Sequence, residues 1–178
     1  MSSVNELERL TQERILHQIF EKKLKYTYLG NYEERENNSN IEEDLLLKFL
    51  IKKYPEEIAR KAIAELKKIA HNETKSLYEV NKEVYNLLKY GKGISMYVGE
   101  KEKQVYFIDY EDYSNNDFYV AEEVRIRGQN EKRPDIVIYI NGIAIGVIEL
   151  KRSTVSINEG IRQNLDNQKA LFIERFFT

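Results

Sequence analysis

Two carboxylates and a lysine flank a pair of apolar runs that are joined by a turn dipeptide. Asp135 begins the first run, and Glu149 and Lys151 end the second. Asn141-Gly142 lies between the runs and is the strongest short-range signal for a β-hairpin, so both carboxylates are expected at one end of a sheet. Carboxylate oxygens are ligands for a hard divalent cation such as Mg²⁺. In one interpretation, these two carboxylates hold a metal ion of the kind that phosphodiester hydrolysis needs.

Lys151 lies two residues after Glu149 and so on the same face of the strand. Its ammonium group is placed to orient an attacking water or to stabilise charge that develops at phosphorus, and the Leu150 carbonyl is a further candidate ligand. The Glu-x-Lys pattern also occurs in helical parts of this chain, so it indicates a candidate site only where it ends an apolar strand. In the alternative interpretation, these residues are polar strand ends that reach solvent. The residues alone leave both interpretations open.

The length of the hairpin loop decides whether the two carboxylates share a face. A strict two-residue loop places Asp135 opposite Ile148 and turns Glu149 to the other face of the sheet. A three-residue loop ending at Gly142 places Asp135 opposite Val147, and the carboxylates then share a face. We therefore expect a positive φ at Gly142 in a three-residue loop, or a break in strand pairing near Asp135.

Helical periodicity covers residues 1–90, and strands follow it. Apolar spacing and helix-start signals predict four helices in this region: Glu6 to Tyr26, one beginning near Glu42, Pro55 to Ala70, and Thr74 to Leu88. The apolar stripe of the first helix is expected at Leu7, Leu10, Ile15, Ile19 and Leu24. The segment Gly30 to Asn40 is a polar break.

After Gly93 the apolar period changes from 3.6 to 2, as in strands. The predicted strands are Ile94 to Val98, Val105 to Tyr110, Phe118 to Ile126, Ile136 to Ile140 and Ile143 to Leu150, before a helix from Ile157 to Phe177. The last two strands are apolar on both faces, so we place them centrally in the sheet with helices on each side. We expect residues 1–90 to form a helical region that packs on and contributes to a sheet core formed by residues 91–178.

Composition limits the class of protein. The chain has 178 residues, a net charge of −2 and no cysteine, which excludes a disulfide framework, a thiolate nucleophile and cysteine-ligated zinc. No apolar run approaches the roughly 18 residues of a membrane span, so we expect an intracellular globular domain. The charge balance argues against a generally basic nucleic-acid coat but allows a local patch.

The hairpin sequence resembles a known motif. Arg133-Pro134-Asp135, the two apolar runs and Glu149-Leu150-Lys151 look like the nuclease motif of the R (restriction/motor) subunit of type I restriction–modification enzymes. Four further stretches resemble the same family: Tyr28 to Asn31, Asn38 to Glu43, Asn116 to Phe118, and Ile161 to Leu165. The resemblance implies an α/β fold of the PD-(D/E)xK restriction-endonuclease-like type, in which helices flank a central mixed sheet, with a helical N-terminal region.

The resemblance also assigns site residues. Asp135, Glu149 and Lys151 match the motif fully, and the Asp and Glu would bind Mg²⁺. Related nucleases carry an acidic residue on an early helix, for which Glu42 is the first candidate and Glu43 the second. Complementation of the helix dipole explains either residue equally well.

Such nucleases often place Gln-x-x-x-Tyr on the helix that follows the sheet. Gln163 fits the first position of that pattern and is expected at the edge of the active site, although Asn167 stands in the Tyr position. The alternative is an exposed helix amide.

The family implies a DNA endonuclease domain that precedes an ATP-driven translocase. No Gly-x-x-x-x-Gly-Lys-Ser/Thr loop occurs in this chain, so ATP would enter only through motor domains that lie outside it. The apolar ending at Phe176-Phe177 suggests an N-terminal fragment of a larger subunit. The implied partners are double-stranded DNA, the methyltransferase and specificity subunits, and the C-terminal translocase domains, in the cytoplasm of a prokaryotic cell and without a membrane.

Two other classes of function remain open. The chain could be a nuclease-fold module that binds DNA without cutting it, or a docking domain, and the acidic segment Asp109 to Glu123 would suit the second. Four basic residues before the motif could contact phosphates or form a polar turn: Arg125, Arg127, Lys132 and Arg133. Tyrosines could stack on bases, but those inside strands are better explained by sheet packing.

Overall fold

The computed structural model describes residues 3–127, 131–150, 158–159, 161–162 and 165. The helices are α1 (Ser3–Glu13), the π-helix η1 (Arg14–Lys23), α2 (Glu43–Leu50), α3 (Glu56–Ala70), α4 (Leu77–Tyr90) and the 3₁₀ turn η2 (Tyr113–Asn115). The strands are β1 (Thr27–Asn31), β2 (Lys92–Ile94), β3 (Lys103–Val105), β4 (Phe118–Glu122), β5 (Ile126–Arg127), β6 (Glu131–Lys132), β7 (Ile136–Ile140) and β8 (Ile143–Ile148). None of the described helices is both long and apolar enough to cross a lipid bilayer.

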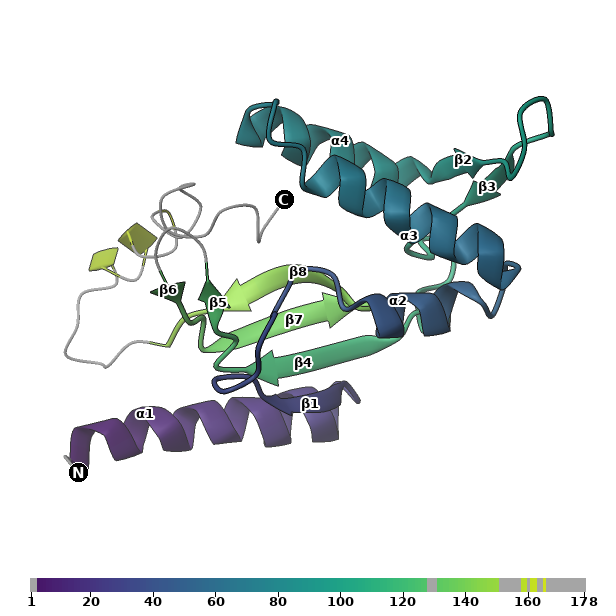
Figure 1. The fold of residues 1–178 in the computed structure, drawn as a ribbon. Coiled ribbons are helices and arrows are strands. Elements are labelled where there is room, and N and C mark those ends of the chain that lie inside the picture. Colours follow the sequence, from purple (N-terminus) through teal and green to yellow (C-terminus); the bar gives the residue numbers. More distant parts are fainter. Residues whose placement is uncertain (1–2, 128–130, 151–157, 160, 163–164, 166–178) are drawn as a thin grey trace. The chain divides into compact units, whose positions relative to one another are not determined.

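The main sheet has the strand order β1-β4-β7-β8 (Figure 1). β1 runs parallel to β4, with an irregularity in register between Tyr28 and Gly30. The N–H groups of Glu123 and Asn141 donate to the carbonyls of Asp135 and Asp117, so β4 and β7 run antiparallel. The protein is therefore α/β with a mixed sheet flanked by helices, as the sequence predicted.

The chain forms two compact units. Unit 1 contains the residues up to Ser39, Phe118–Tyr139 and the described residues from Ala144 onward, and unit 2 contains Asn40–Asp117 and Ile140–Ile143. Both halves of the sequence contribute to each unit.

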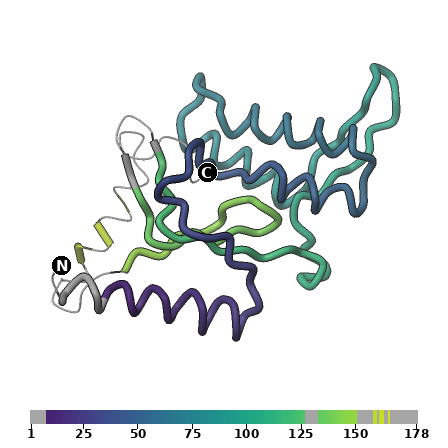
Figure 2. The backbone as a smooth tube through the Cα atoms, turned by 60° about the horizontal axis from the view of Figure 1, so that its bottom comes forward, coloured from purple at the N-terminus to yellow at the C-terminus, as the bar shows by residue number. Residues whose placement is uncertain are grey.

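Helix η1 covers part of the sheet in unit 1 (Figures 1 and 2). Its buried residues Leu16 and Phe20 pack against Val120 of β4 and Ile136 of β7. The predicted stripe is wrong, because Leu10, Ile19 and Leu24 are exposed. The N–H of Leu24 donates to the carbonyl five residues earlier, at Ile19, and this wider turn shifts the buried face of the helix.

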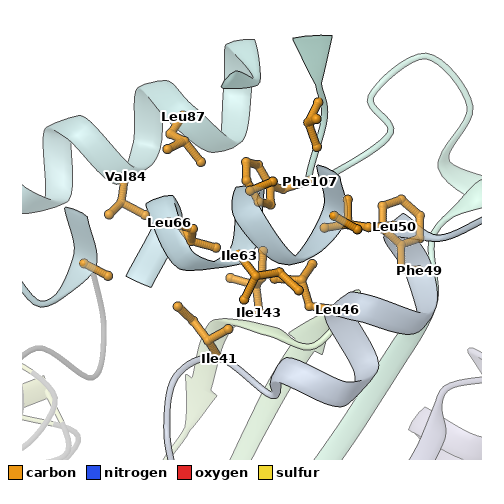
Figure 3. Packing of buried hydrophobic residues seen from close by; sticks show 14 of the residues in the cluster. Ile41, Leu46, Phe49, Leu50, Ile63, Leu66, Val84, Leu87, Phe107 and Ile143 are labelled. Atoms are coloured by element: carbon orange, nitrogen blue, oxygen red, sulfur yellow. The ribbon is translucent and has the colours of Figure 1, made fainter. Parts of the chain in front are cut away.

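Helices α2, α3 and α4 form the apolar core of unit 2 (Figure 3). Its members include Leu46, Phe49 and Leu50 of α2, Ile63 and Leu66 of α3, and Val84 and Leu87 of α4. Pro55 precedes α3, which ends at Ala70 as predicted. α4 begins later than predicted, because Ser76 and Glu79 form a capping box there, and it ends at Tyr90, followed by Gly91 with a φ of 75°.

Several strands differ from the prediction. β1 was not predicted, since its sequence Thr-Tyr-Leu-Gly-Asn lacks the apolar alternation of a strand. β2 and β3 begin two residues earlier than expected and end already at Ile94 and Val105, which are buried. Among the described strands β8 lies at an edge of the sheet rather than in its centre. In the last predicted helix, only residues 158–159, 161–162 and 165 are described, and these are helical.

Candidate active site

The β7–β8 hairpin turns at Asn141 and Gly142, with φ angles of 53° and 89°. Two consecutive positive φ values are typical of a type I′ turn, whose twist matches that of the flanking strands. The loop has two residues, so the expected three-residue loop is wrong, whereas the positive φ at Gly142 is confirmed. Since Ile140 and Ile143 flank the turn, regular pairing would place Asp135 opposite Ile148.

The turn is held by the side chain of Asn141, which is fully buried. Its amide nitrogen donates to the carbonyl of Phe107 at 2.9 Å and to the side chain of Asn116 at 2.8 Å. Its oxygen accepts from the N–H of Asp117 at 2.7 Å. Buried polar atoms with this many partners fix a single geometry, so the turn is a rigid end of the hairpin.

At the other end of the hairpin, Asp135 departs from regular strand geometry. It lies in a bend before β7, which begins at Ile136. Its carboxylate accepts a hydrogen bond from the N–H of Leu150 at 2.5 Å, and its carbonyl accepts from Glu123 at 3.0 Å. Because Leu150 directly follows Glu149, the bond brings the Asp135 carboxylate to the chain segment that carries Glu149.

Two more carboxylates gather where β4 ends. The side-chain amide of Gln12 donates to Glu122 at 2.8 Å and to Glu123 at 3.0 Å. Neighbouring residues of a strand normally point to opposite faces. Glu123 follows the last strand residue and has a φ of 51°, and this left-handed conformation lets both carboxylates reach the same amide. Non-glycine residues rarely adopt such a φ, and they do so most often at functional sites.

The electrostatics of this cluster favour the neutral form of two groups. Burial raises the pKa of Glu123, and the nearby charges of Asp135 and Glu33 raise it further, against the lowering effect of Gln12 and Arg133. Burial also raises the pKa of Tyr28, whose hydroxyl donates to Glu122 at 2.5 Å. A carboxylate with a raised pKa next to Asp135 is a group whose charge a cation would stabilise.

A cleft of about 900 Å³ opens beside these residues. It is lined by Glu8, Arg9, Gln12 and Glu13 of α1, His17 of η1, Asn31, Glu33, Glu122, Glu123, Arg133 and Asp135. Six of these residues carry carboxylates, and the arginines are already paired, Arg9 with Glu13, and Arg133 with both Glu33 and Glu123. A DNA phosphate would therefore meet repulsion in this cleft unless cations accompanied it.

The donor set at this site suits Mg²⁺. Asp135 and Glu149 offer oxygen donors, and Mg²⁺ usually takes one or two protein carboxylates and completes its shell with water and substrate phosphate. Within the described residues no three His, Asp or Glu side chains form a ready-made metal cage. An ion that relies on water and substrate for most of its shell needs no such cage.

The other predicted site residues are placed as follows. Glu42 and Glu43 belong to unit 2, so the structure does not place them with Asp135 and Glu149. The N–H of Glu42 donates to the carbonyl of Gly142 at 2.7 Å, and Glu43 forms an ion pair with Lys67 of α3. Lys151 and Gln163 lie outside the described residues.

Of the four basic residues before the motif, the structure describes the side chains of two. Arg133 pairs with two carboxylates, which argues against its expected contact with phosphate. Arg125 lies beside the loop after β1, where its guanidinium is 3.5 Å from the carbonyl of Glu33. The side chains of Arg127 and Lys132 lie outside the described residues.

Sequence reasoning missed Gln12, Glu122 and Glu123 as parts of this site. Glu122 and Glu123 were assigned to an acidic segment that would suit a docking domain, and nothing in their order reveals the left-handed φ that brings them together. Gln12 lies four residues before Leu16 and eight before Phe20, on a buried face that the predicted apolar stripe did not follow. A polar residue on the buried face of a helix needs partners.

Comparison with known proteins gives a family match and several similar sequences. Residues 5–178 match the family model described as type I restriction enzyme R protein N terminus. The chain is 34% identical over 105 residues to the proposed type I restriction enzyme MjaVIIIP endonuclease subunit of Methanocaldococcus jannaschii, which covers 57% of this chain and 9% of that protein. It is 35% identical over 66 residues to the type I restriction enzyme SauMSSORF170P endonuclease subunit of Staphylococcus aureus, which covers 36% of this chain and 7% of that protein.

The family match extends over nearly the whole chain, whereas the chain spans less than a tenth of the length of these two relatives. The hairpin with its acidic end lies inside the matched region. The chain belongs to the family of type I restriction enzyme R protein N-terminal domains.

Proposed function

We propose that this chain is the Mg²⁺-dependent DNA endonuclease domain of a type I restriction enzyme R subunit, with a PD-(D/E)xK fold. The observation that carries the proposal is the hydrogen bond from Leu150 to the Asp135 carboxylate, which ties the two acidic ends of the hairpin together. The adjoining cleft, rich in carboxylates, supports it, because phosphodiester hydrolysis needs a cation between protein acids and substrate phosphate.

In this proposal Asp135 and Glu149 hold the ion. Bound Mg²⁺ would supply Lewis acidity at the scissile phosphate and a more acidic bound water. The Leu150 N–H fixes the rotamer of Asp135, and the Gln12 amide orients the neighbouring Glu122 and Glu123 carboxylates. Lys151 is expected to stabilise charge on the phosphate oxygens, and Gln163 to lie at the edge of the site.

The substrate would be double-stranded DNA, cut without sequence recognition by this domain. Translocation and ATP hydrolysis would belong to motor domains in the rest of the subunit, and target recognition to the specificity subunit, with the methyltransferase as a further partner. The site of action would be the cytoplasm of a prokaryotic cell.

The test uses the complete R subunit assembled with its partner subunits on circular DNA. Asp135→Asn, Glu149→Gln and Lys151→Ala should each lower cleavage by about 100-fold or more, since each removes a group that holds the ion or stabilises charge on the reacting phosphate. DNA-stimulated ATP hydrolysis should remain. Glu34→Gln, which removes an exposed carboxylate outside the cleft, is the matched control.

A second candidate function is a docking module without catalysis. The observation that favours it is the pairing of Arg133 with Glu33 and Glu123, which leaves no arginine of the cleft available for phosphate. Binding of Mn²⁺ to the 178-residue chain, followed by electron paramagnetic resonance, separates the two functions. The nuclease function is supported if the wild-type chain binds Mn²⁺ and the Asp135→Asn variant does not. It is contradicted if the Asp135→Asn variant cleaves DNA as the wild type does.

A further inference from the structure

Helix α4 presents a stripe of tyrosines and lysines to solvent. Its buried face consists of Val80, Val84 and Leu87. On the opposite face, the tyrosine–lysine stripe is formed by Tyr78, Lys82, Tyr85 and Lys89, all of them exposed. Their spacing of four, three and four residues keeps them within a band roughly 60° wide and about 16 Å long.

The charge of this stripe is not neutralised by its own helix. Both glutamates of α4 are engaged elsewhere, Glu79 in the capping box with Ser76 and Glu83 in an ion pair with Lys75. In the part of the chain that the structure describes, neither Lys82 nor Lys89 forms an ion pair with a carboxylate. The stripe is therefore a cationic surface on a protein whose net charge is −2.

More aromatic rings lie beside the C-terminal end of the stripe. The ammonium of Lys89 lies 5.5 Å from the ring centre of Tyr85 and 5.2 Å from that of Tyr90. Tyr110 lies close enough to Tyr85 and Lys89 to interact with both electrostatically. The residues Tyr85, Tyr90 and Tyr110 are 59%, 59% and 63% exposed, far more than packing against the core would allow.

A pocket of about 290 Å³ adjoins these rings. Phe49, Tyr54, Tyr106 and Tyr110 supply its aromatic walls, and Lys89 supplies a cation that no carboxylate of the pocket pairs with. The Tyr54 hydroxyl accepts a hydrogen bond from the N–H of Tyr106 at 3.1 Å, which fixes the wall of the pocket. The pocket is therefore a preformed aromatic recess next to the stripe.

From these features we infer that the tyrosine–lysine stripe and the adjoining pocket bind a single strand of DNA. Lysines bind the phosphates of any nucleic acid, but exposed rings between them add affinity only where base faces are free to stack. A stripe about 16 Å long would accompany about five phosphates of one strand. The choice of DNA rests on the proposed function, whereas the surface itself is distinct from the Asp135 cleft.

Two acidic residues lie near the pocket and limit its cationic character. Asp109 is already engaged by Lys53 at 2.6 Å, so that pair is neutral. Glu111 forms no ion pair among the described residues, and it lines the pocket together with Lys89. Glu111→Gln should therefore strengthen the binding of a single strand.

The experiment measures binding of a short fluorescein-labelled single-stranded oligonucleotide to the full chain by anisotropy, in EDTA so that cleavage plays no part. Tyr78→Leu with Tyr85→Leu should weaken binding about tenfold for each ring, with little effect on a duplex of the same length. Lys82→Gln with Lys89→Gln should reduce the slope of log affinity against log salt by about 1.4, because two phosphate contacts are lost.

The β2–β3 loop offers matched controls. Tyr97 is 75% exposed, as Tyr78 is, and Lys101 is exposed on the same loop. Tyr97→Leu with Lys101→Gln should leave binding unchanged. Equal weakening by the loop and stripe variants, or unchanged binding by all stripe variants, overturns the inference. Asp135→Asn should bind the strand like the wild type, so loss of cleavage with intact binding separates this surface from the proposed active site.

Discussion

The side-chain amide of Gln12 lies 3.0 Å from a carboxylate oxygen of Glu123, although 111 residues separate the two in the chain. The same amide reaches Glu122 at 2.8 Å and is buried beneath the cleft. One neutral side chain of α1 thus supports two consecutive carboxylates at the end of β4.

Replacing Gln12 by Met should destabilise the protein in a pH-dependent way. The hydrogen bond from Gln12 lowers the pKa of Glu123, so its loss raises a pKa that burial has already raised. A raised carboxyl pKa means that the folded state binds more protons than the unfolded state between the two pKa values, so stability falls as pH rises through that window.

We therefore expect Gln12→Met to cost about 2 kcal/mol near pH 7 and less at pH 4. Urea unfolding at the two pH values measures the difference. Gln12→Glu should be worse at pH 7 than Gln12→Met, since it adds a third carboxylate. An equal cost at both pH values would show that Gln12 acts through packing alone.

Gly142 and Gly99 form a matched pair for testing how tightly the hairpin turn is packed. Their φ angles are 89° and 88°, so alanine at either position carries the same backbone strain. A Cβ at Gly142 would lie 2.6 Å from the Glu42 carbonyl oxygen and 2.9 Å from the Leu46 nitrogen, whereas a Cβ at Gly99 meets nothing within 4 Å.

Gly99→Ala should cost about 1 kcal/mol, and Gly142→Ala at least about 2 kcal/mol more, because backbone atoms must move to admit the methyl group. Thermal unfolding of the two variants gives the difference directly. Similar costs for both would mean that α2 does not pack against the turn as described.

Arg133 offers a test of its expected role in DNA binding. Since it pairs with Glu33 and Glu123, we predict that Arg133→Gln leaves the salt dependence of DNA binding unchanged and raises the pKa of Glu123. Anisotropy across a salt series measures the first effect, and carboxyl-carbon NMR the second. If Arg133→Gln instead lowers the slope of log affinity against log salt on duplex DNA by about 0.9, then Arg133 contacts a phosphate, as the sequence suggested.

Asp109 should make its loop sensitive to acid. Hydrogen bonds from the backbone at Asp112 and from Lys53 and Asn115 hold its pKa well below the ordinary value. A lowered carboxyl pKa contributes stability above the unfolded-state pKa of about 3.9, and this contribution disappears as pH falls through the folded-state pKa.

NMR signals of the amides of residues 111 and 112 should therefore report loss of this loop's hydrogen bonds at low pH. In Asp109→Asn the amide signals should no longer shift with acid. Glu111→Gln, which keeps the Asp109 carboxylate, should behave as the wild type. Unchanged acid shifts in Asp109→Asn would assign them to another group.

The sequence predicted the bounds of helices and strands best where a single local signal determines them. The apolar run Ile136 to Ile140 is a strand with those bounds, and Pro55 and Ala70 frame α3 as expected. The acidic end of the hairpin was also predicted, because a hairpin must return its chain to the starting edge of the sheet.

The failures share a different cause. The π-helical hydrogen bonds of η1, the parallel pairing of β1 with β4, and the left-handed φ of Glu123 all depend on tertiary contacts. A period of 3.6 residues could not reveal a buried face that is set by i→i+5 bonds. The sequence shows Glu122 and Glu123 only as part of an acidic segment, so it could not predict that their carboxylates join Asp135.

The turn at Asn141 and Gly142 is held rigidly, and it therefore fixes the register of the two strands of the hairpin. Asp135 lies six residues before Asn141, and Glu149 lies seven after Gly142. The turn has no room even for a methyl group, so it could not accommodate a residue inserted in either strand. Such an insertion would instead shift Asp135 relative to Glu149 along the hairpin. Insertions for labelling or domain fusion should therefore be made at the open Gly99 loop, where added chain leaves this spacing untouched.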